Sequence, residues 1–273
     1  MYNRKHYPHF GKFQRGISLM ELMVGLTIGL MVVVAALGSL VFTQISSKTV
    51  GDSARLQQKA DNTFRILGFH VQQAGAINLV SNATEPSKVA FSNVFTGYNP
   101  TTTGATAGQI FSVHGLHDGT TVLGTDTLRI SYQDNGAVRD CLGNQPPAAQ
   151  IGIRVDNQFS LDSTTNELKC LGANAATGAQ PVVDGVEDFQ VSYGVQTFLA
   201  NGTPQFQFYR ADQITDWTNV EAVVICLQLV GDNKGNPQPA SFVVTGCRGQ
   251  TVTNDGLLRR VFRRSYGLRN ALL

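Results

Sequence analysis

The sequence has few charged residues, and one stretch has none. Asp, Glu, Lys and Arg make up 15% of its 273 residues, whereas about 25% is usual for a soluble globular domain. Residues 22–42 include no charged residue and no histidine, and residues 17–76 include no proline. Because a helix rises about 1.5 Å per residue, this apolar run is long enough to cross the roughly 30 Å core of a bilayer.

Patterns that indicate catalysis or metal binding are also missing. There is no G-x-S-x-G motif, which marks many serine hydrolases, and no C-x-x-C pair, which marks many zinc sites. His114, His117 and Asp118 form an H-x-x-H pair with an acid, but a strand or loop does not bring such a pair together as a helix would. We interpret these two histidines, and His70, as solvent-facing, and we expect no enzyme activity, no cofactor and no metal site.

Positive charge is concentrated at the start of the chain. The first sixteen residues contain Arg4, Lys5, Lys12 and Arg15 and no acid, so the net charge of +2 would become about −2 without them. Basic residues before an apolar helix favour a cytoplasmic N-terminus, which puts the rest of the chain on the periplasmic or outer side. An ordinary secretory signal fits less well, because the apolar run is too long and no A-x-A site follows it.

Glu21 is the one charge at the start of the apolar run. A charged group in a membrane helix costs on the order of 2.5–3.5 kcal/mol at the bilayer centre and less near an interface. A carboxylate in this position therefore suggests a function and needs a positive partner. Cleavage between Gly16 and Ile17 would create an α-amino group four residues before Glu21.

The segment GISLMEL, with its basic leader and the long helix after it, resembles the class III signal of type IV pilins and pseudopilins. The resemblance implies that a prepilin peptidase cleaves after Gly16 and methylates the new N-terminus at Ile17. It also implies that Glu21 meets the N-terminal amine of a neighbouring subunit during assembly. The alternative from the residues alone is a plain membrane anchor with a glutamate near the interface.

Residues 43–76 are predicted to continue the helix with an apolar stripe on one face. The stripe residues recur at spacings of three and four: Ala60, Phe64, Leu67, Val71 and Ala74. The other face is predicted to be charged, with Lys48, Asp52, Arg55, Lys59, Asp61 and Arg65. We expect the stripe to pack on a sheet.

The remainder, residues 77–273, is predicted to be a β-rich domain. Residues 101–108 (TTTGATAG) are predicted to be an exposed loop. Strands are predicted at 127–133, 137–143, 151–162, 167–172, 180–196, 220–231, 241–249 and 257–270, with a hairpin turn at 134–136 (DNG). The last four of these segments are predicted to form one antiparallel sheet.

Four cysteines, an even number, fit an oxidising compartment. They are Cys141, Cys170, Cys226 and Cys247, and they allow three pairings. We favour Cys141–Cys170 and Cys226–Cys247, since each closes a local loop, and we expect roughly 2–4 kcal/mol of stabilisation from each.

Three further clusters are interpreted as structural or surface features. Asp184, Glu187 and Asp188 are predicted to be a solvated turn with an acid on a strand face, and residues 232–236 (DNKGN) a hairpin turn rather than a calcium loop. The C-terminal arginines are the strongest basic cluster: Arg259, Arg260, Arg263, Arg264 and Arg269. Because few aromatic residues lie among them, we favour a partner or structural role over DNA binding.

The segments VVDGVEDFQVSYGV, RDCLGN, ELKCLG and RRVFRRSYGLRN resemble the PilW-type minor pilins. The fold implied is α+β and pilin-like: a long N-terminal helix, membrane-spanning in its first half, packed on a C-terminal antiparallel β-sheet domain with two disulfides. The corresponding division of the chain is a cleaved leader (1–16), a transmembrane or filament-core helix half (17–42), an amphipathic helix half (43–76) and a periplasmic domain (77–273).

The function implied by this resemblance is that of a minor pilin. Such a protein helps to initiate type IV pilus assembly at or near the tip and supports twitching motility, adhesion or DNA uptake. Its implied partners are other minor pilins, the major pilin, a tip-associated adhesin, the prepilin peptidase and, before assembly, inner-membrane lipid. Two alternatives remain: a minor pseudopilin of a type II secretion system, and a periplasmic binding or enzyme domain on a single anchor.

Overall fold

The computed structural model describes most of the chain. The described residues are 16–76, 79–81, 89–91, 112–118, 125–133, 138–145, 155–173, 178–199, 201–234, 243–252 and 255–270. Residues 1–15 of the predicted leader, the loop 101–108, the turn 134–136 and residues 235–236 lie outside them. The chain forms two compact units, Met1–Ser47 and Lys48–Leu273.

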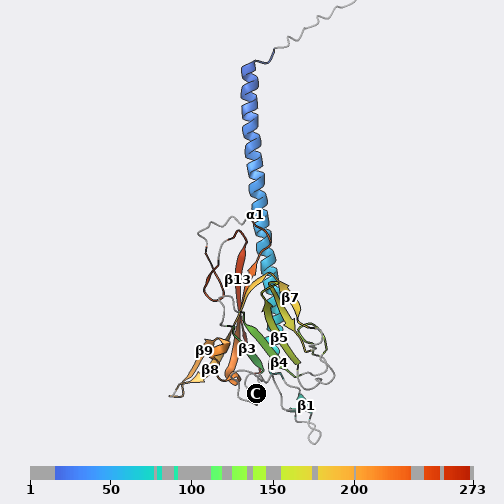
Figure 1. The fold of residues 1–273 in the computed structure, drawn as a ribbon, viewed down its shortest axis with the longest axis vertical. Helices are drawn as coiled ribbons and strands as arrows, with labels where there is room; N and C mark the ends of the chain where they lie inside the picture. Colours follow the sequence, from blue (N-terminus) through green and yellow to red (C-terminus); the bar gives the residue numbers. More distant parts are fainter. Residues whose placement is uncertain are drawn as a thin grey trace, which may run out of the picture. The chain divides into compact units, whose positions relative to one another are not determined.

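A single helix, α1 (Leu19–Gln73), opens the fold (Figure 1). We call residues 19–47 its apolar half and residues 48–73 its packed half. The apolar half is long and hydrophobic enough to cross a membrane, and the chain itself does not bury its most apolar stretch. At the other end Gly75 has a positive φ of 72°, a conformation that favours glycine after a helix. The N–H of Gly75 donates to the carbonyl of Ser131 at 2.9 Å, which fixes the helix end to a strand.

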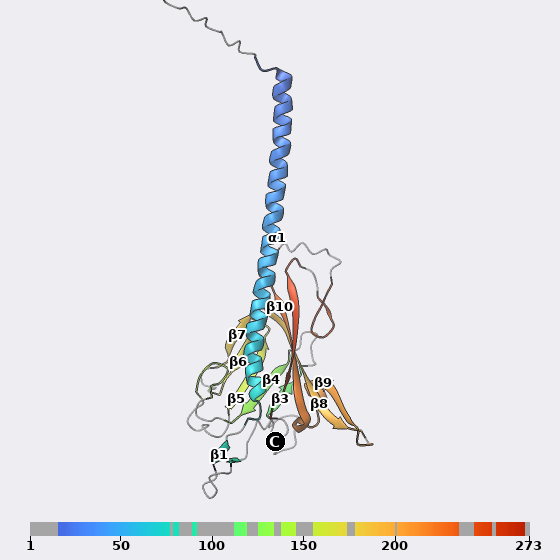
Figure 2. The same ribbon diagram turned by 180° about the vertical axis from the view of Figure 1, so that it is seen from behind.

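The predicted apolar stripe is confirmed. Its residues are all at most 2% exposed, and they share one hydrophobic core with side chains of a five-stranded and a four-stranded sheet. These stripe residues are Ala60, Phe64, Leu67, Val71 and Ala74. Figure 2 shows the packed half of α1 lying against strands of these sheets. The core is therefore shared by the helix and both sheets, and the α+β class predicted from the sequence is confirmed.

The prediction that Asp52 lies on the charged face opposite the apolar stripe is wrong. Asp52 is 3% exposed, and its carboxylate accepts a hydrogen bond from the backbone N–H of Asn233 at 3.1 Å. The side-chain amide of Asn233 donates to the other carboxylate oxygen. A buried carboxylate is tolerated where hydrogen bonds replace its hydration, and here they come from a residue 181 positions away.

One sheet has five antiparallel strands in the order β3-β4-β5-β6-β7. They are β3 (Val113–Leu116), β4 (Thr127–Tyr132), β5 (Val155–Asp162), β6 (Glu167–Leu171) and β7 (Gln180–Asp184). The burial of β5 alternates strictly, with Val155, Asn157, Phe159 and Leu161 inside, as expected for a sheet with one face in the core. A separate pair joins β1 (Leu79–Ser81) to β2 (Val89–Phe91).

The predicted strand at 137–143 does not form among the described residues of that segment. Both edges of β4 are occupied, by β3 and by β5, so β4 cannot pair with a hairpin partner there. Residues 138–145 turn instead, because the carboxylate of Asp140 accepts the N–H groups of Leu142 and Asn144 at 2.9 and 2.8 Å. Asp and Asn favour such turns by bonding to nearby backbone.

The second sheet has four antiparallel strands in the order β13-β10-β8-β9. They are β8 (Val186–Phe198), β9 (Pro204–Tyr209), β10 (Val220–Val230) and β13 (Arg259–Gly267). Two short 3-10 helices, η3 (Ala211–Gln213) and η4 (Trp217–Asn219), connect β9 to β10.

Three details of this sheet differ from the prediction. The segment 180–196 is two strands in different sheets, because Gly185 takes a positive φ of 71° between β7 and β8. Among the described residues of the segment 241–249, only Val244–Thr245 form a strand, β11, which pairs with β12 (Thr251–Val252) outside the main sheet. Strand β9, which was not predicted, takes the edge position.

Candidate functional site

The N-terminal residues that carry the predicted processing and assembly roles stand at the start of α1. Gly16 and Ile17 precede the helix, and Ile17 is 75% exposed. The carbonyl of Ser18 accepts the N–H groups of Glu21 and Leu22 at 3.0 and 3.1 Å, so the helix begins here. An acid in the first turn, as Glu21 is, is favoured by the helix dipole. The roles of these residues in cleavage, methylation and assembly stay predictions.

The apolar half of α1 presents hydrophobic side chains around its whole circumference. Every Leu, Ile, Val, Met and Phe side chain in residues 17–42 is more than half exposed. Soluble proteins rarely expose contiguous apolar surface beyond a few hundred Å². This half therefore has the character of a surface that lipid or other helices cover.

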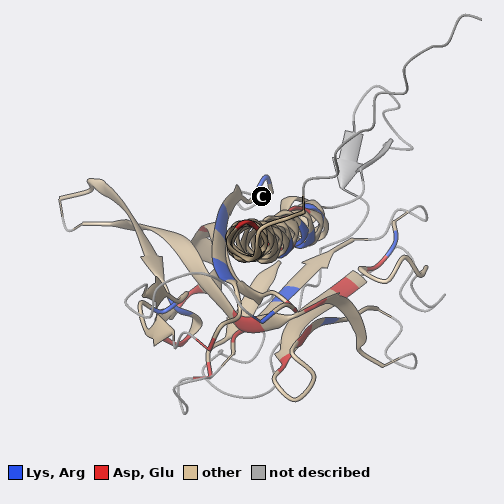
Figure 3. Cartoon of the chain, turned by 90° about the horizontal axis from the view of Figure 1, so that it is seen from above, with Lys and Arg blue, Asp and Glu red and all other residues tan. Residues whose placement is uncertain are grey.

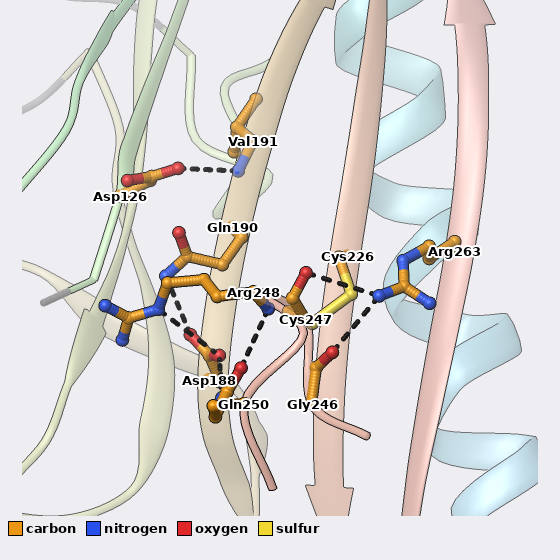
Figure 4. The surroundings of a disulfide bond; sticks show 10 residues. All are labelled: Asp126, Asp188, Gln190, Val191, Cys226, Gly246, Cys247, Arg248, Gln250 and Arg263. Atoms are coloured by element: carbon orange, nitrogen blue, oxygen red, sulfur yellow. Dashed lines mark hydrogen bonds and ion pairs between the residues drawn. A yellow bond between two sulfur atoms is a disulfide. The ribbon is translucent and has the colours of Figure 1, made fainter. Parts of the chain in front are cut away.

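The structure pairs the cysteines as favoured from the sequence, Cys141 with Cys170 and Cys226 with Cys247. Cys226 lies on β10, on the sheet face opposite the buried side chains of Val191 and Tyr193. We call this the outer face. The disulfide fastens residues 243–252 to the outer face, with Cα atoms 5.7 Å apart (Figure 4).

Hydrogen bonds hold the same segment on the outer face. One guanidinium nitrogen of Arg263 donates to the carbonyls of Gly246 and Cys247, both at 3.2 Å. The side-chain amide of Gln250 donates to the carboxylate of Asp188 at 3.0 Å, as Figure 4 shows. The segment is thus anchored at both ends of its turn, and the disulfide has a structural role.

Asp184 is the solvated member of the acidic cluster, and Asp188 is the acid on a strand face, although it is buried there. Asp184 has an exposed side chain, and Lys59 at 3.0 Å lowers the pKa of its carboxyl group by a hydrogen bond. Asp188 is 3% exposed, with Gln190 donating at 2.7 Å and the Arg248 guanidinium at 3.8 Å. Alternation places Asp188 on the outer face, where residues 243–252 cover it.

His70 is also buried, at 4% exposure, contrary to the solvent-facing prediction. Its Nδ1 lies 3.0 Å from the hydroxyl of Tyr132 on β4, and burial lowers its pKa to about 4, against an opposing effect of Asp140. The Tyr132 hydroxyl donates to the Arg139 carbonyl and accepts from Asn157, both at 3.0 Å. This hydroxyl thereby connects α1 to two strands and to the turn that bears Cys141.

The two histidines of the H-x-x-H pair are likewise inside, and they have different neighbours. His114 is 4% exposed and packs on Trp217, with ring centroids 4.6 Å apart. Burial, with a smaller effect of Arg129, lowers its pKa to about 4. His117 contacts the carboxylate of Asp126 at 2.7 Å. Among the residues that the structure describes, no group of three or more His, Cys, Asp or Glu side chains could hold a metal ion.

Asp126 connects the two main sheets. One carboxylate oxygen accepts the N–H of Val191 on β8 at 2.7 Å, and the other contacts His117. Burial raises the pKa of Asp126, whereas the bonds from Val191 and His117 lower it. Asp126 therefore links the segment before β4 to β8 in the four-stranded sheet.

Three of the C-terminal arginines make intramolecular bonds, which supports the structural interpretation. Arg259 donates to Glu187 at 2.8 Å, and Arg263 bonds the carbonyls named above. Arg264 donates to Asp61 on α1 at 2.6 Å and lies over the ring of Phe64 at 5.3 Å. Arg260 and Arg269 are exposed.

The β8–β9 hairpin carries an exposed apolar cluster that the sequence analysis missed. We call it the hairpin patch; its residues are Phe198, Leu199, Phe206 and Phe208. The available signal was the alternation in PQFQFY (204–209), which begins one residue after Asn201-Gly202, a pair typical of hairpin turns.

Comparison with known protein families gives a match in the second half of the chain. Residues 154–270, which include β5 to β13, match the family model PilW, type IV pilus-assembly protein W. The comparison with curated proteins gives no significant match. Among solved structures, a type IV-like pilin from Thermus thermophilus aligns with a TM-score of 0.44 and 14% identity, covering 80% of this chain and 98% of that chain. The PilW resemblance expected from the sequence is confirmed over residues 154–270.

Proposed function

We propose that this chain, whose residues 154–270 match the type IV pilus-assembly protein W family, is a minor pilin that helps to initiate pilus assembly at or near the tip. The observation that carries the proposal is the change of surroundings along α1. Its packed half is buried in a folded domain, whereas its apolar half exposes hydrophobic side chains on every side. A helix of this kind can anchor the domain in a membrane and then exchange lipid for neighbouring helices.

Processing at the start of α1 is part of the same proposal. The prepilin peptidase would remove residues 1–16 and methylate Ile17. The mature chain would consist of the filament-core helix half (17–42), the amphipathic half (43–76) and the periplasmic domain (77–273). Two disulfides support this placement, because the periplasm is an oxidising compartment.

Glu21 would give the assembly step its register. In lipid the carboxylate lacks a partner, and its desolvation is unfavourable. Against the N-terminal amine of a neighbouring subunit, the two charges compensate each other's desolvation. Because one axial offset brings the pair together, the contact selects that offset over others.

The assembly role is tested by deleting the gene and counting surface pili. We expect pili and twitching motility to be lost, to return with the wild-type chain, and exoprotein secretion to be unchanged. Complementation with Glu21→Ala should restore the protein but not the pili, whereas Ser39→Ala, farther along the same helix, should restore both. Normal piliation in the deletion strain would contradict the proposal, and lost secretion with normal pili would favour a pseudopilin.

Processing is tested by the intact mass of the non-reduced protein from native membranes. The expected mass is that of residues 17–273 plus one methyl group and minus four hydrogen atoms, since both disulfides are formed. A mass that fits the uncut chain would favour a domain on a permanent anchor instead.

A further inference from the structure

The hairpin patch concentrates the exposed apolar side chains of the folded domain. In the described part of Lys48–Leu273, eight large hydrophobic side chains are exposed, and Phe198, Leu199, Phe206 and Phe208 are half of them. The pairing of β8 with β9 sets Phe208 opposite Gly194 and Phe206 opposite Gln196. Opposite residues of an antiparallel pair project from the same side, so Phe198, Phe206 and Phe208 share the outer face.

The two rings on β9 are held in place by the sheet itself. Phe206 and Phe208 meet edge to face, with centroids 5.2 Å apart. Both rings lie over Gly194, where the Cβ atom of any other residue would collide with Phe206. Because Gly194 has no side chain, the two rings can lie directly on the sheet surface. Phe206 and Phe208 remain 47% and 50% exposed there.

Strand β9 also lacks the charged side chains that usually protect a sheet edge. It ends the order β13-β10-β8-β9, and no described strand pairs with its other side. Residues 189–209 contain no charged residue and no histidine, and in Figure 3 the hairpin that extends to the left carries no blue or red. Natural proteins usually protect open edges with charge, whereas the centres of protein interfaces are poor in charge and rich in aromatic residues.

The size of the hairpin patch limits what can cover it. At about 200 Å² for a whole phenylalanine, its three rings leave roughly 300 Å² open. A stable complex in solution needs about 800 Å² from each partner. Two free copies of this chain would therefore not dimerise stably through the patch alone, but a partner kept close by a second contact could bind there, because tethering raises its effective concentration.

We infer that β9 and the hairpin patch bind a neighbouring pilin-type subunit other than a second copy of this chain, which adds an uncharged, apolar edge strand beside β9 while its own apolar helix keeps it in the same membrane or filament. This inference rests on the proposed function, because the second contact is the one between apolar helices. A lipid surface fits less well. Arg210, the basic residue that follows the hairpin, is paired with Asp212 at 3.1 Å, whereas surface binding to anionic lipid relies on available Lys and Arg.

Photo-crosslinking of the full-length chain in its own membrane tests the inference. Phe208 is replaced by p-benzoylphenylalanine in one strain, and Thr164, an exposed turn residue of the other sheet, in a control strain. We expect a light-dependent adduct from position 208 only. Its partner should be another pilin-type chain, with the crosslinked peptide in an uncharged edge strand.

Three other outcomes would overturn the inference. They are an adduct with a second copy of this chain, an adduct with lipid, and equal adduct yields from positions 208 and 164. Each would show that the hairpin patch does not select a pilin-type subunit that differs from this chain.

Charge substitution gives a second, independent readout. Phe198→Lys places a charge on a side chain that is 69% exposed, and Phe69→Lys does the same at a 56% exposed site on α1. Phe198→Lys should lower the adduct yield about tenfold, since a buried unpaired charge at an interface costs more than 1.4 kcal/mol, and Phe69→Lys should not. Unchanged non-reduced mass and Trp217 fluorescence confirm that both variants fold.

The two proposals fail in different ways. If the deletion strain loses its pili but Phe198→Lys assembles them normally with full adduct yield, the inference is wrong and the proposed function stands. If the deletion strain keeps its pili, the proposed function itself is wrong.

Discussion

In residues 19–47, α1 carries exposed apolar side chains on all sides, whereas in residues 48–73 it is more polar and one face is buried. Hydrophobicity along this helix therefore does not predict burial within the chain. Periodicity does, because a stripe that repeats every 3.6 residues can be covered by one domain, whereas an apolar surface on all sides cannot. The comparison indicates that the packed half serves the stability of the domain and the apolar half serves contacts with surroundings outside it.

The largest difference in stability between the two halves should appear when one phenylalanine is truncated in each. Phe64→Ala removes a side chain that is 2% exposed and should lower the free energy of unfolding by about 3–5 kcal/mol. Phe42→Ala removes one that is 73% exposed and should change the free energy of unfolding by less than about 0.5 kcal/mol. Urea unfolding of the full chain in detergent, followed by the buried Trp217, measures both. Equal effects would contradict the comparison.

Loss of the Cys141–Cys170 disulfide should destabilise the domain around the packed half of α1. It should not change membrane retention by the apolar half. The Cys141→Ala/Cys170→Ala double variant frees the turn that the Tyr132 hydroxyl connects to His70. We expect the free energy of unfolding to fall by roughly 2–4 kcal/mol. Membrane retention after alkaline extraction should stay unchanged, and a loss of retention would show that the halves are not independent.

Acid should destabilise the domain through its buried histidines. Burial lowers the pKa values of His70 and His114 to about 4, so the folded state favours their neutral forms. Their stabilising contribution is complete above the unfolded pKa of about 6.5 and is lost as the pH falls from about 6.5 to 4, on the order of 1–3 kcal/mol for each histidine. Asp126, whose pKa burial raises, acts in the opposite direction.

Urea unfolding between pH 7.5 and 4.5 measures this dependence. The His114→Gln variant should be less stable at pH 7.5 and should lose less stability over the same range. A wild-type stability that rises toward pH 4.5 would refute the assignment of the slope to these histidines.

The smallest difference in stability between the two halves should appear when one helix glycine in each is replaced by alanine. At Gly68, in the packed half, a Cβ atom would collide with the ring of Tyr266, whereas at Gly29 it would meet no atom. Gly68→Ala should therefore lower the free energy of unfolding by about 1–3 kcal/mol. Gly29→Ala should leave it unchanged. Melting temperatures of the two variants, side by side, distinguish these results.

Much of the fold follows from the sequence because its signals are local. The missing prolines predict the long helix, and the spacing of Ala60, Phe64 and Leu67 predicts its buried face. Alternation predicts β4 from TLRISYQ (127–133), and loop length favours the two cysteine pairs. Each of these signals depends on residues close together in the chain, where backbone geometry sets the period.

Only the tertiary structure decided which polar residues lie inside. Three polar residues of types usually found at the surface are buried here, because each forms a hydrogen bond with a residue far away in the sequence. Asp52 pairs with Asn233, His70 with Tyr132, and Asp188 with Gln250. The tertiary structure also decided which strand belongs to which sheet. The chain turns at Gly185, so that β7 and β8 lie in different sheets, and β9 rather than the segment 241–249 forms the edge of the four-stranded sheet. Which of the described strands pair with one another decides that β9, with its apolar patch, ends the sheet, and this pairing depends on the whole chain rather than on any one segment.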